Sequence, residues 1–243
     1  MKDIKEFYIL GLPIETEIGI CNFLKVKEYP DYYAHLQYIS LTKDQIIENL
    51  INTLKISNDD IDDKTNIFIE QMRNEDLFSI VFSFPDLKEV YGELLFKVFD
   101  SNSNFQLLNS NNFDYYRKLI MDMNCVKEEK INPNPEIQKW IEKSKKFKES
   151  GEKLEFSDIV SSVVGYNGLS YNDINEMTIY QLYMTFQRIG QIKGYDTSTL
   201  FATVAEKVDV QSWCKHIDLF EEEAHGISRE NFDKKIGSIF END

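Results

Sequence analysis

The sequence is poor in cysteine, glycine and proline, and it has no long uncharged apolar run. Its three cysteines, Cys21, Cys125 and Cys214, are odd in number and widely spaced, which argues against a disulfide framework and fits a reducing compartment. Only ten glycines and five prolines in 243 residues favour a helix-rich fold. No stretch approaches the ~18 apolar residues of a membrane helix, and the N-terminus lacks a signal-peptide pattern. We therefore expect a soluble, cytoplasmic protein that has no membrane partner.

Basic residues are also few: 27 lysines and arginines stand against 42 acidic residues, which gives a net charge of −15. Phosphate backbones and anionic lipid surfaces repel such a chain, so we expect no nucleic-acid partner. The one lysine-rich stretch, residues 139–148, has only Trp140 and Phe147 as interleaved aromatics. It is typical of a solvated connecting segment, and a nucleic-acid patch or a site for an acidic segment is the alternative.

Motifs for catalysis are missing as well. None of the three histidines, His35, His216 and His225, lies near a Gly-x-Ser-x-Gly turn, because the sequence contains none. The glycine-rich motifs that bind phosphates or dinucleotides do not occur either. Cys214 with the two C-terminal histidines supplies too few ligands for a zinc site. We predict a protein that is not an enzyme and that binds no metal or other cofactor.

Two polar runs offer oxygen ligands of the kind that calcium prefers. That template needs a glycine at its sixth position and a glutamate at its twelfth, and residues 59–63 are followed by Lys64 where the glycine is needed. Residues 100–104 begin that template but then place Phe105 and Asn111 at those two positions. Both runs are therefore predicted to be solvated loops.

Apolar residues make up 42% of the chain, with 17 phenylalanines and 13 tyrosines, and their spacing predicts the fold. Short apolar runs at residues 7–10 and 18–26 predict strands, with Gly19 as a bulge. Residues 32–39 fit either a further strand or a helix. We predict a mainly α (α+β) protein, with a small N-terminal antiparallel β element followed by helices and a helical C-terminal region.

Helical periodicity dominates after residue 41. The capping box of Thr42 and Gln45 opens the first clear helix. A strand fragment is predicted at residues 107–108. The other predicted helices span 64–73, 77–84, 87–99, 112–123, 156–164, 170–176, 178–192 and 197–207, and a terminal amphipathic helix carries Phe232, Ile236 and Phe240.

The strongest break in the chain is the segment Asn132-Pro133-Asn134-Pro135, which lies among highly charged residues. It divides the chain into three predicted parts. These are an N-terminal α+β region at residues 1–125, a charged linker or helix at 126–155 and a helical C-terminal region at 156–243.

Residues 156–220 are expected to form the centre on which other helices pack. Thr178 and Gln181 form a second capping box at the start of a helix. Apolar residues after this start are too many for one face, so the helix is predicted to be buried nearly all round. Trp213 and Cys214 are predicted to be core residues.

Several short motifs in this half of the chain resemble segments of certain phage proteins. They are Asn134-Pro135-Glu136-Ile137-Gln138-Lys139, Phe156-Ser157-Asp158-Ile159-Val160, Met177-Thr178-Ile179-Tyr180-Gln181-Leu182-Tyr183, Phe186-Gln187-Arg188-Ile189 and Tyr195-Asp196-Thr197-Ser198-Thr199-Leu200-Phe201. Over roughly residues 132–240 the chain resembles tail assembly chaperone-like proteins of phages and prophages of low-GC Gram-positive hosts.

This resemblance implies a non-enzymatic factor of the host cytoplasm that holds the tape-measure protein while the tail tube forms. The alternative is a structural tail or baseplate component that stays in the virion. Apolar helix faces are the expected partner-binding surfaces, with self-association as a further option. The residues predicted to bind a partner are Tyr180, Tyr183, Phe186, Phe232, Ile236 and Phe240.

Overall fold

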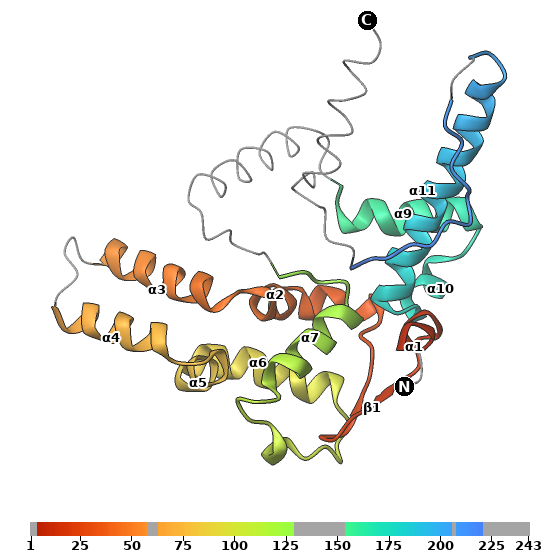
Figure 1. Cartoon of the computed structure of the whole chain (residues 1–243). Helices are drawn as coiled ribbons and strands as arrows, with labels where there is room; N and C mark the ends of the chain where they lie inside the picture. The colour runs from red at the N-terminus through yellow and green to blue at the C-terminus, as the bar shows by residue number, and fades with distance from the viewer. Residues whose placement is uncertain (1–3, 58–62, 129–153, 206–207, 221–243) are drawn as a thin grey trace, which may run out of the picture. The chain divides into compact units, whose positions relative to one another are not determined.

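A computed structural model describes residues 4–57, 63–128, 154–205 and 208–220 of the chain. The features below belong to one compact unit, formed by residues 1–130 and 154–219. Helices predominate, and the predicted mainly α fold with a small antiparallel β element near the N-terminus is confirmed (Figure 1). The elements are α1 (Ile4–Leu10), β1 (Ile14–Glu15), β2 (Ile20–Cys21), the 3-10 turn η1 (Val26–Glu28), α2 (Tyr29–Ser40), α3 (Lys43–Ser57), α4 (Asp63–Asn74), α5 (Leu77–Ser83), α6 (Pro85–Val98), η2 (Phe105–Leu107), α7 (Phe113–Met123), α9 (Phe156–Asn167), α10 (Tyr171–Glu176) and α11 (Ile179–Ala202).

The β element is a two-stranded hairpin in which Ile14 pairs with Cys21 and Glu15 with Ile20. Gly19 lies in its turn with φ +149°, a conformation that side chains rarely adopt. A Cβ there would lie 1.9 Å from the Oγ of Ser103. The predicted bulge is therefore wrong, because Gly19 serves the turn and a close approach of the loop that follows α6.

The strands predicted around this hairpin are largely wrong. Residues 7–10 belong to α1, whose Tyr8 is buried. Residues 32–39, for which the sequence left both a strand and a helix open, belong to α2. Most of the predicted strand 18–26 is a buried extended segment that does not join a sheet. Its backbone instead bonds to the ends of helices: the N–H of Asn22 donates to the carbonyl of Val98, and that of Val26 to Met177. Such bonds satisfy a buried backbone without strand partners.

The helices between residues 42 and 123 follow the sequence prediction closely. The N–H of Thr42 donates to Gln45 Oε1 at 2.8 Å and the N–H of Gln45 to Thr42 Oγ1 at 3.2 Å, so the capping box that opens α3 is confirmed. Helices α3 and α4 pair through a small apolar cluster that includes Ile47 and Ile69. The predicted strand fragment at 107–108 is wrong, because η2 ends there.

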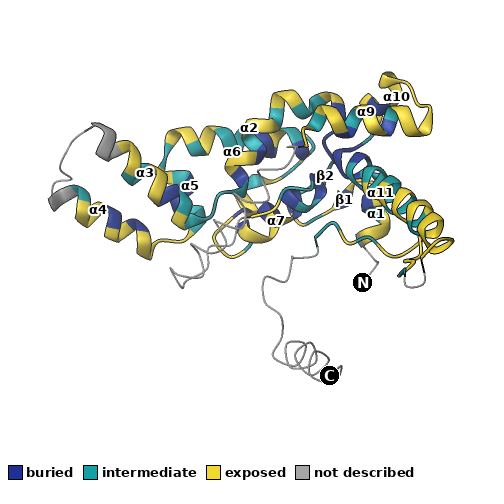
Figure 2. Ribbon diagram, turned by 90° about the horizontal axis from the view of Figure 1, so that it is seen from above, coloured by how far each residue is buried: buried dark blue, intermediate teal, exposed yellow. Residues whose placement is uncertain are grey.

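A block of buried side chains lies where α2, α6 and α7 meet the hairpin (Figure 2). Arg117 of α7 is buried among them with an exposed fraction of 6%. Its Nε donates to the carbonyl of Ile39 at 2.8 Å, and a terminal nitrogen donates to the carbonyl of Leu41 at 2.9 Å. A terminal nitrogen also forms an ion pair with Glu128 at 3.2 Å. The guanidinium thus caps the end of α2, whose last carbonyls have no helical partner.

Helices α9, α10 and α11 share a second cluster of buried side chains with η1: Val26, Ile159, Val163, Ile174 and Leu182. The capping box at the start of α11 is confirmed, because Thr178 and Gln181 bond to each other's backbone N–H groups. Gln181 also donates to the carbonyl of Ile9 at 3.0 Å. Thr178 pairs with Lys25 through an isolated bridge. This helix start therefore ties α11 to both α1 and the extended segment.

Helix α11 is longer and more exposed than predicted. It runs for 24 residues through Gly194 and includes most of the separate helix predicted at 197–207. One exposed glycine costs a helix only about 1 kcal/mol, so it need not end one. The expectation of burial all round is wrong, since only Ile179, Tyr180 and Leu182 are buried. Towards its end Leu200 is 69% exposed (Figure 2).

Residues 208–220 follow α11 as an irregular segment. A terminal nitrogen of Arg188 donates to the carbonyl of Trp213 at 2.7 Å and to that of Lys215 at 3.0 Å, which fixes this segment against the helix (Figure 1). Among the helices described, none is both long and apolar enough to span a membrane.

Candidate functional site

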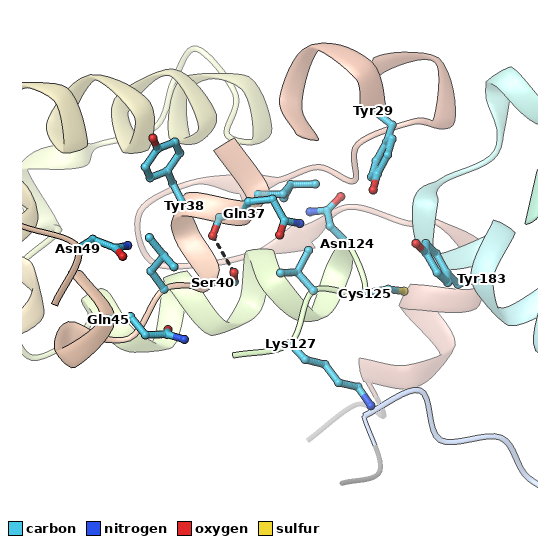
Figure 3. A pocket seen from close by; sticks show the side chains of 13 residues that line it. Tyr29, Gln37, Tyr38, Ser40, Gln45, Asn49, Asn124, Cys125, Lys127 and Tyr183 are labelled. Carbon is cyan, nitrogen blue, oxygen red and sulfur yellow. Dashed lines mark hydrogen bonds between the residues drawn. The ribbon is translucent and has the colours of Figure 1, made fainter. Parts of the chain in front are cut away.

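A pocket of about 550 Å³ opens beside α2, and its lining is mostly uncharged (Figure 3). Its size lies within the range of about 300–1,000 Å³ that is usual for ligand sites. We call it the amide pocket, because four carboxamide side chains line it together with three tyrosines. The lining residues are Tyr29, Leu36, Gln37, Tyr38, Ser40, Leu41, Gln45, Asn49, Asn124, Cys125, Val126, Lys127 and Tyr183.

Two tyrosines close one end of the amide pocket. Tyr29 stands at the start of α2 and Tyr183 on α11, and both line the pocket. Burial raises the pKa of both phenols, and the neighbouring Tyr33 raises both further. The ring of Tyr29 stacks on Phe156 with centroids 3.9 Å apart, which holds this end of the pocket in place.

The end of α7 forms the neighbouring part of the wall, and it has the hydrogen bonds of a Schellman motif. The N–H of Val126 donates to the carbonyl of Met121 at 2.9 Å, and that of Cys125 to Asp122 at 3.3 Å. Cys125 occupies the position where glycine is usual, with φ +55°. Its sulfur points toward Tyr183 (Figure 3). The tight turn thereby aims Asn124 and Cys125 into the pocket.

Asn124 is the most buried polar residue of the pocket, with an exposed fraction of 2%. Its Nδ2 donates to the carbonyl of Ile120 at 2.8 Å. Its Oδ1 has no hydrogen-bond partner within the described part of the chain. Buried carbonyl oxygens nearly always have a partner, so this acceptor is an exception that a bound donor would remove.

The side chains that line the amide pocket are mostly uncharged near neutral pH. Burial, and then the nearby Asp122, raise the pKa of the Cys125 thiol to about 12, so it stays protonated near neutral pH. Among the described residues that line the pocket there is no aspartate, glutamate or histidine. Hydroxyls and carboxamides can donate and accept hydrogen bonds but are poor bases near neutral pH.

The partner-binding residues predicted from the sequence fall into three groups. Tyr180 is buried at 4% exposed, and its ring packs edge-on against Tyr8 at 5.2 Å, so it belongs to the core. Tyr183 lines the amide pocket, and Phe186 is partly buried against the cluster shared by α9, α10 and α11. Phe232, Ile236 and Phe240 lie outside the described residues.

The structure also tests the sequence predictions for Trp213, Cys214 and the loop at residues 100–104. Trp213 is 50% exposed and Cys214 is exposed, so the prediction that both are core residues is wrong. Residues 100–104 form a loop, as predicted, in which the Oγ of Ser103 donates to Asp100 at 2.6 Å. Within the described ranges no three carboxylate, thiol or imidazole side chains gather as a metal site would require. His225 and the lysine-rich stretch 139–148 lie outside those ranges.

Sequence reasoning missed most of the amide pocket. Its lining residues are scattered along the sequence between Tyr29 and Tyr183, so no single short motif contains them. The one local signal is the tyrosine-rich start of α2, which the sequence analysis left as either strand or helix.

Known relatives identify the family of the chain. Family models described as the YomV N-terminal domain and the YomV second domain match residues 2–133 and 146–218. The SPbeta prophage-derived uncharacterized protein YomV of Bacillus subtilis (strain 168) is 38% identical over 241 residues, which are 99% of each chain. The chain belongs to the YomV family. No solved structure matches it.

The bounds of the two YomV domain models can be compared with the predicted linker and with the compact unit. The gap between them falls inside residues 126–155, which the sequence predicts to be a linker. Most of both domains nevertheless belongs to a single compact unit. Tyr183, of the YomV second domain, lies in the same pocket as Asn124 of the YomV N-terminal domain.

Proposed function

We propose that this chain is a non-catalytic phage tail assembly factor of the chaperone type, which binds the tape-measure protein and keeps it soluble. Its prophage-derived relative supports a phage origin. The sequence resemblance of residues 132–240 supports the role in tail assembly. In this proposal the chain acts in the cytoplasm of the host, before the tail is complete.

The observation that carries the proposal is the amide pocket. Tyrosines and carboxamides provide large contact areas and adaptable hydrogen bonds, the combination that antibody surfaces use to bind polypeptides. The pocket adjoins α11, where the partly buried Tyr183 and Phe186 are followed by Leu200 and Phe201, which are 69% and 56% exposed. We infer that a polypeptide with exposed apolar segments contacts both the pocket and the exposed far end of α11.

The electrostatic character of the chain supports a chaperone role. A net charge of −15 keeps a complex with an apolar partner in solution, because like-charged complexes repel one another. Lining residues without a carboxylate or imidazole fit binding better than catalysis.

Co-expression tests this function. The tagged chain is produced together with the tape-measure protein of its own prophage, and the soluble and insoluble fractions are compared with those from the tape-measure protein alone. We expect the tape-measure protein to move into the soluble fraction and to co-purify with the tag. A tape-measure protein that stays insoluble and does not co-purify would overturn the proposal.

Purified virions separate the proposal from a structural role in the tail or baseplate. An assembly chaperone leaves before the particle is complete, so mass spectrometry of the particles should not detect this chain. Its detection in a fixed ratio to the tail proteins would favour the structural role.

A further inference from the structure

The wall of the amide pocket contains a buried acceptor that has no partner among the described residues. Asn124 Oδ1 is unpartnered among the described residues, while the other end of the same carboxamide is held by Ile120. A buried acceptor without a partner costs a protein about 1–3 kcal/mol. That cost is removed when a ligand donates an N–H or O–H group to it. The carboxamide lies on the side of the pocket where Gln37 and Tyr29 also lie (Figure 3).

The remaining carboxamides of the pocket offer both donors and acceptors. The side chains of Gln37 and Asn49 have no hydrogen-bond partner among the described residues, and both are exposed. Gln45 uses its Oε1 to accept from Thr42, which leaves its NH₂ group for a ligand. A carboxamide carries the same donor and acceptor groups as a peptide bond. The set therefore matches the alternating N–H and C=O groups of an extended backbone.

Charge restricts the ligand further. Lys127 is the only charged residue among the described residues that line the pocket. Nucleic acids need several cations to bind their phosphates, and the chain as a whole is strongly acidic. A strongly charged ligand would lose its hydration without a compensating partner. An uncharged ligand with backbone-like polar groups and apolar side chains avoids both costs.

We propose that the amide pocket binds an extended, uncharged polypeptide segment through its backbone, and that a shift of the Asn124 side chain on binding lets one backbone N–H donate to its Oδ1. Tyr29, Tyr38 and Tyr183 cover the side chains of that segment, while Gln37 and Asn49 bond to its peptide groups. This inference rests on the proposed function in one respect, since both require that the chain bind a polypeptide. Because the bonds go to the backbone, the pocket accepts many sequences.

The test uses the full chain and two sets of fluorescent peptides. One set overlaps along the tape-measure protein, and the other along an unrelated unfolded protein, carboxymethylated lactalbumin. Fluorescence anisotropy measures the Kd of each peptide. The tightest binder is then made again with a single backbone N-methyl group at each position in turn. We expect one position at which N-methylation weakens binding by about 10-fold or more, equal to about 1.4 kcal/mol.

Protein variants locate the binding. The double variant Gln37→Ala with Asn49→Ala removes two exposed carboxamides of the pocket and should also weaken the tightest binder by about 10-fold. Its matched control, Asn66→Ala with Gln71→Ala, removes two exposed carboxamides of α4 that do not line the pocket, and should bind as wild type does. A flat N-methyl scan, a pocket variant with unchanged affinity, or no binding of either set would overturn the inference.

The two proposals can fail separately. If lactalbumin peptides bind in the pocket and tape-measure peptides do not, the proposed partner is wrong and the inference stands. If the pocket variant captures the tape-measure protein as well as wild type does in co-expression, the proposed function stands and the inference is wrong.

Discussion

At the scale of single residues, the fold depends on polar side chains that bond to backbone groups left over at the ends of helices. Arg117 caps the end of α2, Thr178 caps the start of α11, and the carboxamide of Asn124 bonds to the last turn of α7. Each end of a helix leaves about four backbone groups without a helical partner. The side chains that bond to these groups therefore decide where chain segments meet. Asn124 differs from the others, because it lines a pocket and its second polar atom has no partner among the described residues.

Arg117→Met is expected to destabilise the protein by about 3 kcal/mol, because two helix-end carbonyls and Glu128 lose a buried charged partner. Urea unfolding followed by circular dichroism measures the change. Lys118→Met is the matched control, since this neighbouring side chain is 72% exposed and pairs only with Asp122. It should change the free energy of unfolding by no more than about 0.5 kcal/mol. Equal losses in the two variants would show that Arg117 has no special role.

At the scale of elements, helix starts were predicted well and strands poorly. The capping boxes at Thr42 and Thr178 depend on residues three positions apart, so the sequence alone contains the signal. The extended segment around Leu24 is apolar because it crosses the core, and nothing local distinguishes it from a strand. Whether its backbone pairs with a strand or with Met177 depends on distant residues. Tertiary contacts determine the hydrogen-bond partner of this segment, and the local sequence pattern does not predict that partner.

Thr178→Ala tests the junction between α11 and the N-terminal elements. Loss of the cap should lower the free energy of unfolding by about 1 kcal/mol. Thr197→Ala, in the exposed part of the same helix, removes a threonine without a capping role and should be neutral or slightly stabilising. Thermal unfolding of the two variants beside wild type makes the comparison. If Thr178→Ala unfolds at the temperature of Thr197→Ala, the cap does not hold this junction.

At the scale of the whole molecule, the two YomV domains meet through backbone pairing and an exposed charge cluster. Glu176, at the end of α10, accepts from both Lys25 and Lys27 at 2.5 Å. These hydrogen bonds from Lys25 and Lys27 lower the pKa of the Glu176 carboxyl to about 2. The carboxylate is thus favoured in the folded protein relative to the unfolded chain.

This pKa has a consequence for stability against pH. Because the folded pKa lies below the ordinary value of 4.5, the contribution of Glu176 is complete above that value and is lost as the pH falls toward 2. Between about pH 5 and about pH 3, the melting temperature of wild type should therefore fall by more than that of Glu176→Gln. Glu70→Gln removes an exposed carboxylate that pairs within α4 and should follow wild type. Identical acid profiles of wild type and Glu176→Gln would contradict this account of the junction.

The candidate site could be predicted from the sequence only in part. Tyr183 was chosen from its helical pattern and does line the amide pocket, whereas Tyr180, three residues earlier, faces α1. Helical periodicity predicts which residues share a face of a helix, but it does not predict which other element packs against that face. Asn124 and Cys125 enter the pocket through a tight turn after α7, in which cysteine replaces the glycine that would have marked it.

Photo-cross-linking from the amide pocket, in cells that make the tail proteins, tests most directly whether the phage partner binds there. Tyr38→p-benzoylphenylalanine places the reactive group at the pocket, where the native side chain is 46% exposed. Tyr171→p-benzoylphenylalanine places it on α10, away from the pocket lining, at a site that is 60% exposed. We predict an adduct with the tape-measure protein from position 38 and none from position 171. No adduct from position 38, or equal adducts from both, would contradict the account.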